Sequence, residues 1–179
     1  GHERLHLAER EGLLRDELRE LDEALWAGDV ARAALAGVLH ALGKAQAIGR
    51  LDMIAMAPSW AKFNHVDDAH RHASSANRAL SRFQMELDDV QERHDAAFAI
   101  EVGARAAFAD SFFDDLVSDW VVQCRIVNSR RSAAVARTRV GRMQRALQRR
   151  RFEVEAEWKA VRDRARELGR PESRGDEPA

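Results

Sequence analysis

The 179-residue sequence contains no tyrosine and only one threonine, Thr138. β-Strands favour aromatic and β-branched residues, so a chain with so few of them is poorly suited to forming a sheet. Alanine, leucine, arginine and glutamate dominate instead, and these residues are strong helix formers. The composition therefore excludes an all-β protein, disfavours an α/β fold and predicts an all-α fold.

Cysteine and long apolar runs are also scarce. The single cysteine, Cys124, excludes an intrachain disulfide and a cysteine-based zinc site, and it indicates a reducing compartment. The most apolar stretch, residues 30–42, is interrupted by Arg32 and His40, and no stretch approaches the roughly 18 apolar residues of a membrane helix. We therefore expect a cytoplasmic protein without membrane contact, in which Cys124 is a small buried hydrophobic residue.

Proline is absent between Pro58 and Pro171, which permits a very long C-terminal helix over residues 104–168. Apolar residues recur in it at intervals of seven, the spacing of a coiled-coil seam. A helix of roughly 60 residues would measure about 90 Å at 1.5 Å per residue. The seven residues of the repeat are Ile126, Ala133, Val140, Leu147, Val154, Val161 and Leu168.

Three further helices are predicted, over residues 3–27, 29–48 and 65–98. Gly28 and Asp29 interrupt the first pattern, with Asp29 placed as an N-cap. Residues 49–64 are predicted to be a packed connector, and 169–179 a disordered tail. The last of the three helices carries a seam with four-three spacing from Ala69 to Val90. The expected architecture is one domain, residues 1–168: an elongated antiparallel helical hairpin or bundle with coiled-coil-like packing.

The net charge of −1 hides a separation of charge along the chain. Residues 125–151 contain ten arginines and no acid, whereas residues 86–119 contain ten acids and two bases. The first helix, with nine acids against four bases over residues 3–29, could lie along the arginine run. Nucleic acid is an alternative partner, and a protein or an anionic surface is a third. The candidate anion contacts are Arg130, Arg131, Arg137, Arg142, Arg145 and Arg149.

A polar cluster is predicted around Asp119, which falls in the phase of the apolar seam. A carboxylate there costs several kcal/mol unless it is paired or ligated, so we expect a partner from the connector. The main interpretation is an ion-paired cluster that fixes the fold, without metal or cofactor. The alternative is a metal site of His65, Asp110, Asp114 and Asp119. The full candidate cluster is Asp52, Lys62, His65, Asp110, Asp114, Asp119 and Trp120.

Two blocks of the sequence resemble those of an uncharacterised family of bacterial helical, coiled-coil-like proteins. The second block, F-A-D-S-F-F-D-D-L-V-S-D-W over residues 108–120, carries most of the similarity. The first block is looser and includes Asp52-Met53, Lys62, His65, Val66, Asp68 and Ala69. Within the first block, between Met53 and Lys62, the chain has Ile54–Pro58 where the family has a run of glycines. The resemblance implies a helical protein and no established activity.

Taken together, these patterns predict a non-enzymatic interaction or scaffolding protein that forms homo-oligomers. Trp158 lies where an intrachain partner helix is least expected, so an exposed apolar stripe there would favour dimerisation. The alternative functions are a nucleic-acid-binding accessory protein that uses residues 125–151, and a metal-binding helical protein that uses the Asp/His cluster.

Overall fold

The computed structural model describes residues 2–52, 59–93 and 126–169, and each of these segments is an α-helix. The described part of the chain contains no strand, which confirms the all-α prediction. None of the three helices has a long enough apolar stretch to cross a membrane. The helices are α1 (His2–Asp52), α2 (Ser59–Arg93) and α5 (Ile126–Gly169).

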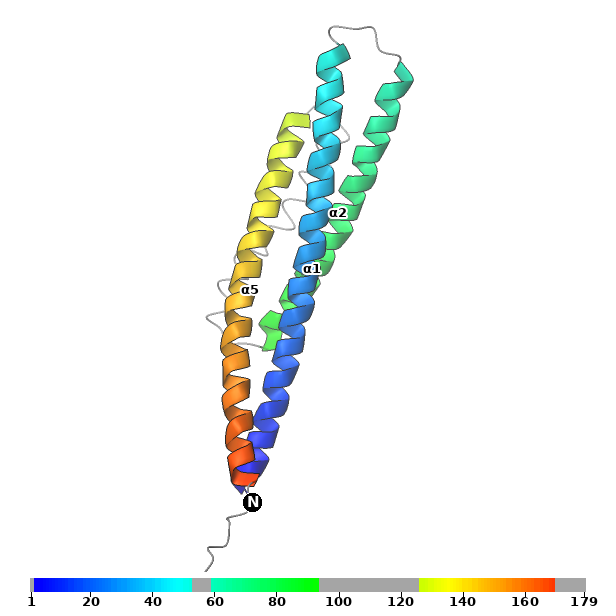
Figure 1. Ribbon diagram of the computed structural model, residues 1–179. Coiled ribbons are helices and arrows are strands. Elements are labelled where there is room, and N and C mark those ends of the chain that lie inside the picture. Colours follow the sequence, from blue (N-terminus) through cyan, green and yellow to red (C-terminus); the bar gives the residue numbers. More distant parts are fainter. Residues whose placement is uncertain (1, 53–58, 94–125, 170–179) are drawn as a thin grey trace, which may run out of the picture.

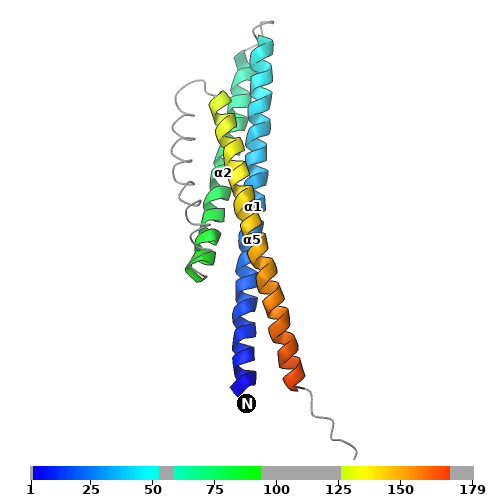
Figure 2. The ribbon, with the colours of Figure 1, turned by 90° about the vertical axis from the view of Figure 1, so that its left-hand side faces the viewer.

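Helix α1 is the shared element of the structure. Both α2 and α5 run antiparallel to α1 and pack against it, whereas in the described segments α2 and α5 do not pack against each other (Figures 1 and 2). With 51 residues, α1 is about 77 Å long at 1.5 Å per residue. The result is an elongated three-helix arrangement of the described segments within one chain, in which both other helices pack on α1.

Several predicted boundaries are wrong. Residues 28 and 29 do not interrupt the first helix, because α1 is continuous from His2 to Asp52. Of the connector predicted over 49–64, residues 49–52 belong to α1 and residues 59–64 to α2, while 53–58 lie outside the described residues. Helix α2 begins directly after Pro58, so it does not have to accommodate the proline. The predicted long helix is observed from Ile126 to Gly169, and residues 94–125 and 170–179 lie outside the described residues.

The predicted apolar seams form the core. On α2 the buried residues follow the expected spacing from Ala76 to Val90, and on α5 Ala133, Val140, Leu147 and Val154 are buried at intervals of seven. Helix α1 contributes a wider apolar face because it has two partners to cover. Its buried apolar side chains are Leu14, Leu21, Ala24, Ala27, Ala31, Leu35, Val38, Ala41 and Leu42.

One layer of the α1–α5 interface changes from apolar to ionic along its length. In α1 this layer contains Val38, Ala31 and Ala24, which are seven residues apart and buried. The same repeat continues toward the N-terminus as Glu17, Arg10 and Glu3. Each of these three side chains forms an ion pair with α5, and we call the three pairs the ionic ladder. Its pairs are Glu17 with Arg150 at 2.8 Å, Arg10 with Glu157 at 2.5 Å and Glu3 with Arg164 at 3.2 Å.

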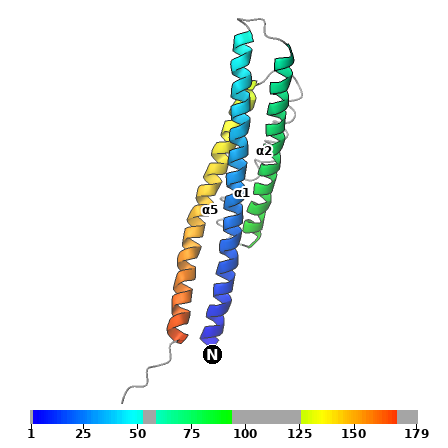
Figure 3. The same cartoon turned by 45° about the vertical axis from the view of Figure 1, so that its right-hand side comes forward.

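The change in polarity coincides with the end of α2. The Arg82 guanidinium lies 4.8 Å from the Trp26 ring centroid, and Gly37 lies against His72, which fixes the register of α2 on α1. If this register continues, Arg93 reaches the level of Arg15 and Asp16. Beyond that level α1 and α5 continue together without α2 (Figure 3).

We call this two-helix portion, residues 2–13 and 155–169, the arm. No residue of the arm is fully buried. The exposed fraction of the acidic side chains in the ionic ladder rises from the bundle toward the end of the arm, from 10% for Glu17 to 43% for Glu157 and 59% for Glu3. Water reaches the layer once α2 has ended. Charged residues can therefore occupy the positions of the seven-residue repeat that are apolar where α2 also covers α1.

Candidate functional site

The polar cluster predicted around Asp119 falls mostly outside the described residues. This applies to Asp110, Asp114, Asp119 and Trp120, and also to Cys124. Asp52 is the last residue of α1, while Lys62 and His65 belong to the first turns of α2. The contact between these two groups therefore remains a prediction. Within the segments that the structure describes, no three His, Cys, Asp or Glu side chains are grouped so that they could hold a metal ion.

The C-terminal end of the arginine run pairs with α1. Arg150 binds Glu17 in the ionic ladder, and Arg151 Nε donates to Asp22 Oδ1 at 2.5 Å on the other flank of the interface. The hydrogen bond and charge of Asp22 raise the pKa of Arg151, and Glu3 acts in the same way on the pKa of Arg164. The acidic first helix therefore does lie along the arginine run, and Arg150 and Arg151 form ion pairs with it.

A second polar element lies deep in the α1–α5 interface around Gln144, which is only 3% exposed. Its Nε2 donates to the Leu25 carbonyl oxygen at 3.2 Å and to Asp29 Oδ1 at 2.7 Å. Its Oε1 accepts a hydrogen bond from Arg32 Nη1 at 3.2 Å. Because both ends of the buried amide are satisfied, this group stabilises one alignment of α5 on α1 and disfavours others. We call Gly28, Asp29, Arg32 and Gln144 the Gln144 node.

Gly28 makes room for this node. A Cβ atom at Gly28 would lie 2.8 Å from Cγ and 2.9 Å from Nε2 of Gln144, closer than unbonded atoms approach. The expectation that Gly28 and Asp29 end a helix is therefore corrected: the glycine is a helical residue that admits the Gln144 side chain, and Asp29 accepts a hydrogen bond from α5 rather than capping α1. Sequence reasoning missed the node because its two halves are more than 100 residues apart.

Three arginines of α5, namely Arg131, Arg142 and Arg145, form what we call the outward arginine face. On a helix with 3.6 residues per turn they project within about 60° of one another and roughly opposite the buried Val140 and Leu147. All three are exposed, and no acidic side chain of the described segments forms an ion pair with them. Their charges are therefore not used to hold α5 on α1.

The other predicted anion contacts are placed differently. Arg130 donates to Gln46 Oε1 of α1, so this arginine contributes to the helix interface. Arg149 shares the face of Arg142 and Arg145 but is already engaged in an interaction. Arg137 is exposed on the flank of α5.

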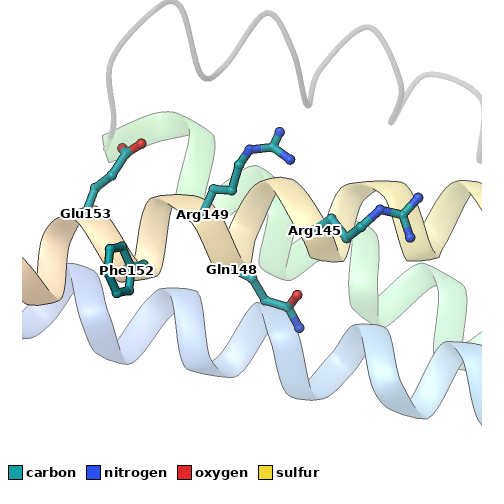
Figure 4. A pocket seen from close by; sticks show the side chains of 5 residues that line it. All are labelled: Arg145, Gln148, Arg149, Phe152 and Glu153. Atoms are coloured by element: carbon teal, nitrogen blue, oxygen red, sulfur yellow. The ribbon is translucent and has the colours of Figure 1, made fainter.

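An open pocket borders the outward arginine face at its C-terminal end (Figure 4). Gln148 leans toward α1, whereas Arg149 and Glu153 extend from the opposite side of α5. Phe152 is 75% exposed, and no pattern in the sequence points to it. The described residues that line the pocket are Arg145, Gln148, Arg149, Phe152 and Glu153.

Trp158 has an intrachain environment, contrary to the prediction. It packs against the hydrophobic core and lies beneath Arg162, whose guanidinium carbon is 4.5 Å from the ring centroid. The partner is the N-terminal part of α1, which the ionic ladder holds beside this part of α5 through Arg10 and Glu157. The expectation that Trp158 lacks an intrachain partner is therefore wrong.

The chain matches no protein-family model, and neither a curated protein nor a solved structure is significantly similar to it.

The Gln144 node predicts that alanine changes the free energy of unfolding in opposite directions at two glycines of α1. Gly28→Ala should lower the free energy of unfolding by about 1–3 kcal/mol, because the new methyl group displaces Gln144 from its hydrogen bonds. Gly12→Ala, where no neighbouring atom lies within 4 Å, should raise it by about 0.5–1 kcal/mol through helix propensity. Urea unfolding measures both values, and the node would lose its role if the two variants changed stability alike.

Proposed function

We propose that the protein is a non-enzymatic, elongated helical scaffold that binds its partner through the outward arginine face. The observation that carries this proposal is that Arg131, Arg142 and Arg145 are exposed on the side of α5 away from α1. Charged side chains that stabilise the fold sit elsewhere, in the ionic ladder and the Asp22–Arg151 pair. Three cations gathered on one surface attract an anionic partner and accelerate its encounter.

The extended shape supports the scaffold part of the proposal. Antiparallel pairing with α1 holds α5 over its length, from Arg130 near Gln46 to Arg164 near Glu3. A long helix held in this way presents its outer face as a preorganised surface, which reduces the entropy lost on binding. We assign this activity to the cytoplasm, in keeping with the single cysteine.

We further propose that copies of the chain self-associate through the arm and its junction with the bundle. Leu5 and Leu13 of α1 are 58% and 63% exposed, and Phe152 of α5 is 75% exposed. Leu5 and Leu13 belong to the arm and Phe152 lies near its junction with the bundle, and exposed large apolar side chains are typical of interaction surfaces.

The self-association proposal predicts a concentration-dependent molar mass in light scattering. The wild-type chain should approach the mass of two copies at micromolar concentration, and Leu5→Gln/Leu13→Gln should remain at the mass of one. Both leucines are exposed, so circular dichroism should show an equally helical variant. A single-chain mass for the wild type across the whole range would contradict the proposal.

Site-specific photo-cross-linking tests the binding face itself. A benzophenone amino acid replaces the exposed Thr138, which shares the arc of the outward arginine face, or Met85, which is 67% exposed on α2. In cell extract we expect a discrete cross-linked species at position 138 and none at position 85. Adding Arg131→Gln/Arg142→Gln/Arg145→Gln should abolish this species.

The same triple variant controls for unfolding. Surface substitutions usually change stability by no more than about 0.5 kcal/mol each, so its free energy of unfolding should change by no more than about 1.5 kcal/mol. Identical products at positions 138 and 85, or a product that survives the loss of the three arginines, would contradict the proposed binding face.

A further inference from the structure

We propose that the outward arginine face binds the phosphate backbone of duplex nucleic acid without reading its sequence. This inference rests on the proposed function, because it names the partner of the same surface. It follows from the charge of α5 around the face, from the arrangement of the three arginines and from the residue types that lie between them.

The face lies within a purely cationic stretch of α5. No acidic residue occurs from Ile126 to Phe152, so nothing on α5 itself offsets the field of the three arginines there. The planar guanidinium group matches phosphate oxygens with two parallel hydrogen bonds and stays charged at any physiological pH. Cations without interspersed acids are the electrostatic pattern expected of a surface that follows a phosphate backbone.

The spacing of the arginines gives several contacts along one line. Arg142 and Arg145 are about 4.5 Å apart along the helix axis, and Arg131 lies about 16 Å further on. The three positions therefore span about 21 Å, which corresponds to about six steps of 3.4 Å along one strand of a duplex. Because the α1 interface holds α5 along its length, all three guanidinium groups can engage phosphates of one duplex together.

The residues between the arginines favour phosphate over an acidic protein. Protein interfaces depend on large buried anchors such as aromatic side chains, and the arc between Arg131 and Arg145 offers only Val135 and Thr138. Asn, Gln and acidic side chains are the other common readers of base edges, and the one such residue between Arg131 and Arg145 is Gln144, which is buried in its node. Contacts to phosphate without base readout imply binding that is independent of sequence.

The number of contacts predicts the dependence on salt. Three neutralised phosphates give a slope of about −2.7 for log affinity against log salt concentration, so affinity should fall about 40-fold between 50 and 200 mM salt. Removing the three arginines should remove most of this dependence together with the affinity.

Fluorescence anisotropy with the full chain and a labelled 20-base-pair DNA duplex of random sequence tests the inference. The variant is Arg131→Gln/Arg142→Gln/Arg145→Gln. The matched control is Arg15→Gln/Arg19→Gln/Arg78→Gln, which removes three exposed arginines from α1 and α2 and changes the net charge equally. We expect the first variant to lose at least tenfold in affinity at 50 mM salt and the control to change less than threefold. An RNA duplex run in parallel shows which nucleic acid binds more tightly.

Three results would overturn the inference: no binding by the wild-type chain at 50 mM salt, equal losses in the two variants, or displacement of the duplex by polyglutamate at the same concentration of charge. The last result would assign the face to an acidic protein. Photo-cross-linking at Thr138 separates the two levels of the argument. A protein product there without duplex binding ends this inference and leaves the proposed function standing. The absence of both a cross-linked product and duplex binding ends both.

Discussion

Helix α1 has to cover two other helices at once, and most features of the structure follow from that constraint. Between about Glu17 and Leu42 it faces α2 on one side and α5 on the other, so its buried residues form a broad band of alanine, leucine and valine. Small residues such as Ala24, Ala27 and Ala31 permit close approach of the helices. Helix α2 ends near the level of Arg15 and Asp16, and only α5 accompanies α1 from there to the N-terminus. The layer that contains Ala31 and Ala24 continues there as the ionic ladder, which begins at Glu17.

The same constraint determines what α5 can offer to a partner. Because α5 packs against α1 and not against α2 in the described segments, one side of α5 is sufficient to hold it in place. That side contains the apolar seam, the Gln144 node and the ladder arginines. Exposed ion pairs contribute at most about 1 kcal/mol each, and two of the three ladder pairs are exposed. The apolar seam therefore supplies most of the stability, and the ladder chiefly favours one register. Among the described segments, Arg131, Arg142 and Arg145 contribute to neither the apolar seam nor the ladder.

Periodicity alone predicted much of the fold. The seams from Ala76 to Val90 and from Ala133 to Val154 are buried as their spacing indicated, because a repeat of seven places these residues on one face regardless of the partner. The break at Gly28 could not be judged in this way. Whether a glycine ends a helix or admits a neighbouring side chain depends on Gln144, whose position is known only after α5 is aligned on α1.

The candidate site was predictable only in part. The clustering of arginine was visible in the sequence. Which arginines pair with α1, as Arg150 and Arg151 do, and which form the outward arginine face depends on the direction in which each side chain projects. The ionic ladder likewise becomes apparent only when the antiparallel register is known, since Glu3, Arg10 and Glu17 look like ordinary surface charges in sequence. The cluster around Asp119 remains a prediction.

Hydrogen exchange along α1 tests most directly the claim that this helix is covered twice in one part and once in the other. Amide protection reports local opening, which is easier where fewer buried contacts must separate. The structure predicts strong protection from about Leu21 to Leu42 and exchange at least tenfold faster from Leu5 to Leu13, with the change near the level where α2 ends. Equal protection along the whole of α1, or a change at Gly28, would contradict the account.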